Sequence, residues 1–111
     1  MAKLQTLYMH DNILTIFEPD FSSSVATPPL VDLLIHNNKL KQLNQEVFND
    51  MTFLRYLNAG DNRLESFPDF SLMTHTNNLG YLDLRNNAIS SMPEESIENL
   101  NSLVSLYISG N

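Results

Sequence analysis

Two histidines stand at matching places in the chain and are the first candidates for chemistry. His10 and His36 are 26 residues apart, and Asp11 follows the first of them. Imidazole nitrogens and carboxylate oxygens bind transition metals, but a metal site needs three or four protein ligands in a fixed geometry. Beyond Asp11 the further ligands are missing. We therefore expect no metal and no other cofactor.

The other polar residues show no recognisable catalytic spacing. The Gly-x-Ser-x-Gly, phosphate-loop and His-Glu-x-x-His motifs are all absent. Gly60 and Gly110 fall where turns are expected, not in a phosphate cradle. The chain has no cysteine, which excludes disulfides, thiol nucleophiles and thiolate metal sites. The sequence thus favours a protein that is not an enzyme.

Tyrosine and arginine are the residue types most enriched in binding hot spots, and both occur here. Tyr8, Tyr56, Tyr81 and Tyr107 are spread along the chain, with Arg85 between the last two. They form one surface only if the elements that carry them lie side by side.

A leucine pattern recurs at intervals that would place these elements side by side. Leu-x-x-Leu-x-Leu-x-x-Asn-x-Leu occurs almost end to end, and its copies begin at residues 4, 30, 54, 79 and 103, so the steps are 26, 24, 25 and 24 residues. The repeats are 4–29, 30–53, 54–78, 79–102 and a partial 103–111, together forming one domain. Each Leu-x-Leu predicts a short strand with both leucines on one face. One unit cannot bury that face alone, so stacked units are expected to share a core beneath a parallel sheet.

An asparagine follows each predicted strand, where the chain must turn. Its amide both donates and accepts, so it can pair backbone groups of its own turn and of the adjacent turn. These residues are therefore expected to form an internal ladder; they are Asn12, Asn38, Asn62, Asn87 and Asn111.

These repeats resemble the leucine-rich repeat family over nearly the whole chain. The second and fourth repeats look like the 24-residue "typical" repeats of extracellular animal proteins such as Toll-like receptors, Slit proteins and small proteoglycans. The resemblance implies an α/β fold: a right-handed solenoid with a parallel sheet on the concave face and short helices or irregular loops on the convex face. It also implies a non-catalytic module that binds a protein ligand through the concave face.

Reading the exposed strand positions across repeats gives rows of neighbours about 4.8 Å apart, one strand spacing. One row is Thr6, Asp32, Tyr56, Tyr81 and Ser105; the next is Tyr8, Leu34, Asn58, Asp83 and Tyr107; the third is His10, His36, Gly60, Arg85 and Ser109. The candidate ligand-binding residues in these rows are Tyr8, Leu34, Tyr56, Tyr81, Asp83, Arg85 and Tyr107. The alternative is that these tyrosines simply pair across strands, as aromatic residues in sheets do.

The returning segments carry the remaining apolar anchors and most of the acids. The anchors are Leu43, Val47, Phe48 and Met51 in the second repeat, and Met92, Pro93, Ile97 and Leu100 in the fourth. Ser91-x-x-Glu94 with Pro93 predicts a short helix over 93–100. Repeats one and three lack such anchors, so looser loops are expected there. With nine of the thirteen acids in these segments, the convex surface should be acidic.

Net charge and hydropathy limit the classes of partner that the chain could bind. A formal charge of −7 disfavours nucleic acid, and no apolar run is long enough to span a membrane. The predicted partner is a protein.

The repeats lack the polar caps that stacked repeats need. The chain is therefore expected to be a fragment of a larger extracellular or cell-surface protein, with self-association through its open ends. The absence of cysteines and of Asn-x-Ser/Thr sequons suits the alternative, a cytoplasmic interaction scaffold of a signalling or immune-sensor protein.

Overall fold

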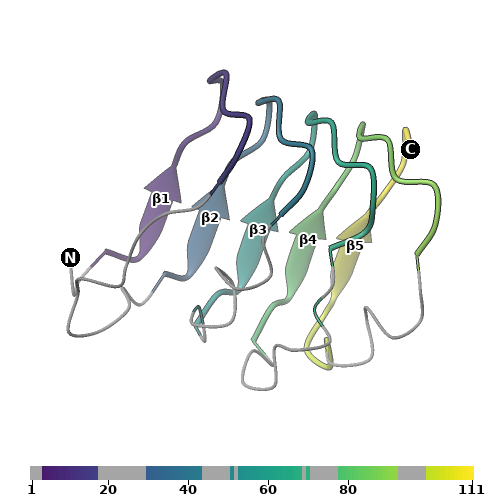
Figure 1. Ribbon diagram of the computed structural model, residues 1–111. Coiled ribbons are helices and arrows are strands. Elements are labelled where there is room, and N and C mark those ends of the chain that lie inside the picture. Colours follow the sequence, from purple (N-terminus) through teal and green to yellow (C-terminus); the bar gives the residue numbers. More distant parts are fainter. Residues whose placement is uncertain are drawn as a thin grey trace.

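In the computed structural model, five short strands lie side by side in chain order and point the same way (Figure 1). The structure describes residues 4–17, 30–43, 51, 53–68, 70, 78–92 and 100–111. The strands are β1 (Thr6–Tyr8), β2 (Asp32–Leu34), β3 (Tyr56–Asn58), β4 (Tyr81–Asp83) and β5 (Ser105–Tyr107). Each strand pairs in parallel with the next. The predicted parallel sheet of a repeat solenoid is confirmed.

The middle leucine of each strand forms the central column of the core. Register aligns Leu7, Leu33, Leu57, Leu82 and Leu106. The three central members are fully buried, whereas Leu7 and Leu106 are only partly buried, because each has a neighbouring strand on one side alone. Leucines from the rest of the pattern extend this core on both sides of the column. One face of the sheet is thus closed by the core, and we call the other, which carries the three rows, the open face.

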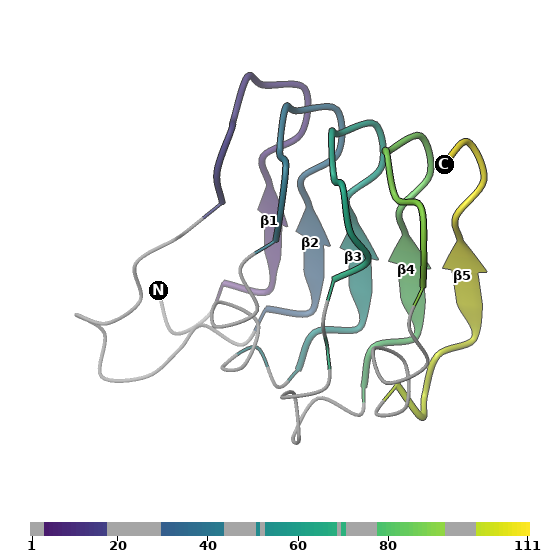
Figure 2. The same ribbon diagram turned by 45° about the vertical axis from the view of Figure 1, so that its right-hand side comes forward.

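The turns that follow the strands stack on one another (Figure 2). In each turn, the residue before the asparagine has a left-handed backbone conformation. These residues have φ between 52° and 79°, and they are Asp11, Asn37, Asp61, Asn86 and Gly110. Aspartate, asparagine and glycine are the types that adopt this conformation with least strain. The amides of the first four continue the parallel ladder, as in the Asp61 N–H bond to the Arg85 carbonyl at 2.8 Å. The sequence signal is plain afterwards: every one of the five asparagines follows an Asp, Asn or Gly.

Asn62 shows how the turn asparagines connect repeats. Its Nδ2 donates to the carbonyls of Ala59 (3.0 Å) and Gly60 (3.0 Å) in its own repeat and of Ile35 (3.2 Å) in the preceding one. Its Oδ1 accepts from the amide of Leu40 at 3.1 Å. The same cross-repeat bonds are made by Asn38, Asn87 and Asn111. Asn12, in the first repeat, donates only within its own turn, to the carbonyls of Met9 and His10.

The returning segments fall partly outside the described residues. The helix expected over 93–100 lies almost wholly there, as do the anchors Val47, Phe48, Pro93 and Ile97 and the looser loops of repeats one and three. Met51 and Leu100 are buried, and Leu43 is partly buried. Phe67 and Phe70, which the pattern had not singled out, are also buried and meet edge to face at 6.3 Å.

Met92 corrects an expectation. We expected a buried anchor, but its side chain is 39% exposed, because it lines an open pocket together with Ile108 and Asn111. Among the residues described, there is no helix with the length and apolar character needed to span a membrane.

Candidate functional site

The strand register places three of the candidate tyrosines in one cluster on the open face. Tyr56 and Tyr81 are register partners whose rings stack at 4.3 Å between centroids, with 12° between their planes. Tyr107 leans against Tyr81 at 5.2 Å and 45°. The cluster therefore spans β3, β4 and β5, and we call these three residues the tyrosine cluster.

Tyr8 lies apart from this cluster. It is 66% exposed on β1, and its ring meets His10 edge-on at 5.9 Å. Leu34, its register partner on β2, is half-buried. The expected strip of Tyr8, Leu34, Tyr56 and Tyr81 is thus divided: Tyr56 and Tyr81 stack on each other, whereas Tyr8 packs against His10.

An ion pair adjoins the tyrosine cluster. Arg85 donates from Nε to Asp83 Oδ1 at 3.0 Å and from Nη2 to Oδ2 at 2.6 Å, a bidentate arrangement. The Arg85 amide also donates to Oδ1, at 3.1 Å. The guanidinium carbon sits 4.9 Å from the centroid of the Tyr107 ring. Arg85 comes two positions after Asp83 in the extended chain, so the alternation of faces places both side chains on the open face, and this spacing was the sequence signal for the pair.

Burial and charge shift the pKa of Asp83 in opposite directions. This residue is only 3% exposed. Burial alone would raise the pKa of its carboxyl, but the hydrogen bonds and charge of Arg85 outweigh it and lower that pKa below its usual value of 3.8. The same contacts raise the pKa of Arg85. Burial, and then the neighbouring Tyr56 to which it is hydrogen-bonded, raise the pKa of Tyr81. Tyr81 therefore stays neutral and the Asp83–Arg85 ion pair stays charged at neutral pH.

The two histidines stack in the third row but gain no further ligands. The rings of His10 and His36 are parallel within 6°, with centroids 4.6 Å apart. The Nδ1 atoms of both are inaccessible to solvent and have no hydrogen-bond partner in the described structure. His10 Nε2 lies 3.7 Å from Asp11 Oδ2. No group of three or more possible metal ligands occurs in the part of the chain that is described.

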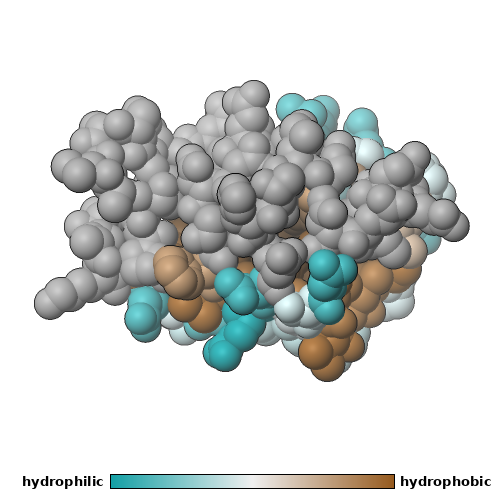
Figure 3. Space-filling model, turned by 90° about the horizontal axis from the view of Figure 1, so that it is seen from below, coloured by the Kyte–Doolittle hydropathy of each residue, from teal (hydrophilic) through white to brown (hydrophobic). Residues whose placement is uncertain are grey.

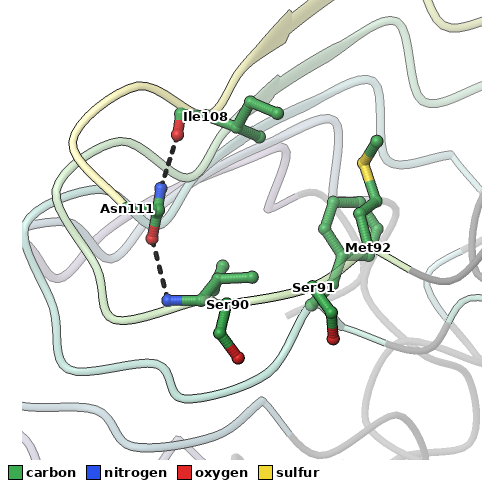
Figure 4. A pocket seen from close by; sticks show the side chains of 7 residues that line it. Ser90, Ser91, Met92, Ile108 and Asn111 are labelled. Carbon is green, nitrogen blue, oxygen red and sulfur yellow. Dashed lines mark hydrogen bonds between the residues drawn. The ribbon is translucent and has the colours of Figure 1, made fainter.

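A separate pocket opens in the turns at the β5 end, and no tyrosine lines it. Its volume is about 160 Å³. Asn111 crosses its rim (Figure 4): its Nδ2 donates to the Ile108 carbonyl at 2.7 Å, and its Oδ1 accepts from the Ile89 amide at 3.1 Å. The lining residues are Phe67, Ile89, Ser90, Ser91, Met92, Ile108 and Asn111. Hydrophobic surface also gathers at this end of the molecule (Figure 3), where Val104 is 88% exposed.

Comparison with known proteins agrees with this architecture. Residues 60–111 match the family model described as leucine rich repeat. The chain is 31% identical over 108 residues to osteomodulin of Bos taurus and 31% identical over 111 residues to osteomodulin of Rattus norvegicus. This chain is built of leucine-rich repeats.

This chain corresponds to only part of each relative. The alignments include 97% of this chain but 25% of each osteomodulin, so the chain spans about a quarter of the length of the relatives it matches. The family match and the parallel sheet agree on a leucine-rich-repeat architecture.

Proposed function

We propose that this leucine-rich-repeat segment is a non-catalytic module that recognises a protein ligand through the open face of its sheet. The tyrosine cluster, with Arg85 packed on Tyr107, is the observation that carries the proposal. Tyrosine and arginine combine large contact area with polar tips, and they dominate binding energy where they are prearranged. Here they are held by stacking and by the Asp83 ion pair before any ligand arrives.

The experiment compares ligand capture by variants of the open face. The chain is immobilised, and binding of proteins from an extracellular-matrix extract is quantified by mass spectrometry. The double variant Tyr56→Ala, Tyr81→Ala should lose at least about tenfold in capture, the loss expected for one hot spot of 1.4 kcal/mol or more.

A matched control changes exposed residues on the turns. Lys39 and Arg63 are exposed and lie outside the three rows, so Lys39→Ala, Arg63→Ala should bind like the unaltered chain. Circular dichroism checks that both double variants keep the fold. Undiminished capture by the tyrosine variant would exclude the tyrosine cluster from ligand binding.

We further propose that the module acts outside the cell, as part of a larger matrix or cell-surface protein. The 24-residue repeat type and the similarity to osteomodulin support this compartment. Expression of the tagged full-length protein in animal cells tests it, with recovery from the medium or the outer cell surface as the expected result. Recovery only from the cytosol would favour an intracellular scaffold instead.

A further inference from the structure

An aspartate and a tyrosine are register partners at two places on the open face. Asp83 pairs with Tyr107 between β4 and β5, and Asp32 pairs with Tyr56 between β2 and β3. At the first place a guanidinium occupies the space beside both side chains: Arg85 is bidentate to Asp83 and lies over the Tyr107 ring. This arginine comes from the same strand face as Asp83, two residues later.

The second place has the same carboxylate and ring without the cation. Leu34 stands two residues after Asp32, where Arg85 stands after Asp83. No Lys, Arg or His nitrogen of the described residues lies within the 4.0 Å ion-pair distance of Asp32. Among the described residues, the Asp32 carboxylate accepts one side-chain hydrogen bond, from Thr6 Oγ1 to Oδ2 at 3.3 Å, so lone pairs on both oxygens remain.

Tyr56 likewise has one side occupied. Tyr81 stacks on it at 4.3 Å from the β4 side, and no other described ring or cation packs against it. The side that faces β2 therefore borders Asp32, one strand spacing of about 4.8 Å away. Both residues are half-buried, so the surrounding water is only partly displaced and a ligand can reach them.

We propose that Asp32 and Tyr56 bind an arginine side chain of the protein ligand. This names a contact within the open-face recognition proposed above and rests on it for the source of the arginine. The carboxylate supplies charge-assisted hydrogen bonds and the ring supplies a cation–π contact, as Asp83 and Tyr107 do for Arg85. Arginine fits better than lysine because its planar guanidinium can stack on the ring while it binds the carboxylate. The net charge of −7 attracts such a ligand.

The site is tested directly with a small probe. N-acetyl-L-arginine amide is titrated into the chain while the amide resonances of Asp32 and Tyr56 are followed by NMR, which reads weak binding well. The neutral isostere N-acetyl-L-citrulline amide should cause no comparable shifts. Asp32→Asn and Tyr56→Leu should each weaken probe binding by about two- to fivefold, the size of an exposed ion pair or cation–π contact. Glu65→Gln, which removes the same charge from an exposed turn residue, should leave binding unchanged.

A self-filling variant provides the sharper test. Leu34→Arg recreates the spacing of Asp83 and Arg85, so its own guanidinium should occupy the site and abolish the shifts caused by the probe. Leu34→Gln is the uncharged control and should still bind. The unfolding midpoint of each variant, followed by circular dichroism, shows whether the fold is retained.

Shifts centred on Asp32 and Tyr56 that disappear in Leu34→Arg and weaken in Asp32→Asn would support the site. Shifts that persist in both variants, or that fall equally in Glu65→Gln, would overturn it as mere attraction to net charge. The probe needs no protein ligand. Probe binding without protein capture would therefore refute the proposed function alone, and capture without probe binding would refute this site alone.

Discussion

At the scale of single residues, the turn asparagines differ in the hydrogen bonds that they make between repeats. Asn62 makes four hydrogen bonds, two of them to the preceding repeat, and is 9% exposed. Asn62→Leu orphans these buried backbone groups and should lower the free energy of unfolding by about 1–3 kcal/mol. Asn12→Leu should cost less, because Asn12 is exposed and bonds only within its own turn. Urea unfolding of both variants measures this; equal losses would mean that the bonds between repeats contribute little.

The ion pair of Asp83 makes a prediction about pH. Because the folded-state pKa of Asp83 lies below its usual 3.8, the unfolded chain binds more protons between the two values, and stability falls as the pH falls. The contribution of this carboxylate is complete above the unfolded pKa and is lost as the pH drops through the folded one. The stability difference between the unaltered chain and Asp83→Asn should therefore shrink in acid. Thermal unfolding of both proteins is measured at neutral pH and at about pH 2.5. A stability difference that does not change between the two pH values would show that Asp83 does not contribute to the loss of stability in acid.

At the scale of the elements, the left-handed residue decides whether each strand can turn out of the sheet. Asn86 has φ 59°, and its Nδ2 donates to Asp61 Oδ1 at 3.0 Å. Asn86→Val forces a β-branched residue into this conformation and should cost about 1–2 kcal/mol more than Asn86→Gly. Both changes remove the same hydrogen bond, so their difference isolates the backbone effect. Chemical denaturation would show it, and equal midpoints would argue against a strained turn.

At the scale of the whole molecule, stability should depend on position in the stack, since each repeat is buried only by its neighbours. Leu57 is fully buried at the centre, whereas Leu7 on the edge strand is partly exposed. Leu57→Ala should therefore lower the free energy of unfolding by about 2–5 kcal/mol, and Leu7→Ala by clearly less. Circular dichroism in increasing urea gives both values. A greater loss at Leu7 would contradict a core shared between adjacent repeats.

The repeat pattern was enough to predict the strands, their order and their register. Side chains in a strand alternate with period two, and equal positions in stacked repeats must coincide. The rows that join Asp32 to Tyr56 and Tyr56 to Tyr81 therefore followed from spacing alone. The sequence also determined where the chain turns, because an asparagine follows the predicted strand in every copy of the pattern.

The contacts within those rows were decided only by the tertiary structure. Spacing placed Tyr8 and Tyr107 alike, yet Tyr107 joins the cluster while Tyr8 stands against a histidine. The pattern likewise did not predict the bidentate hydrogen bonds from Arg85 to Asp83, the exposure of Met92 or the left-handed backbone conformation in the turns. The reason is physical: a repeat pattern specifies backbone positions, but rotamers, burial and ion pairs depend on which neighbours surround each side chain in space.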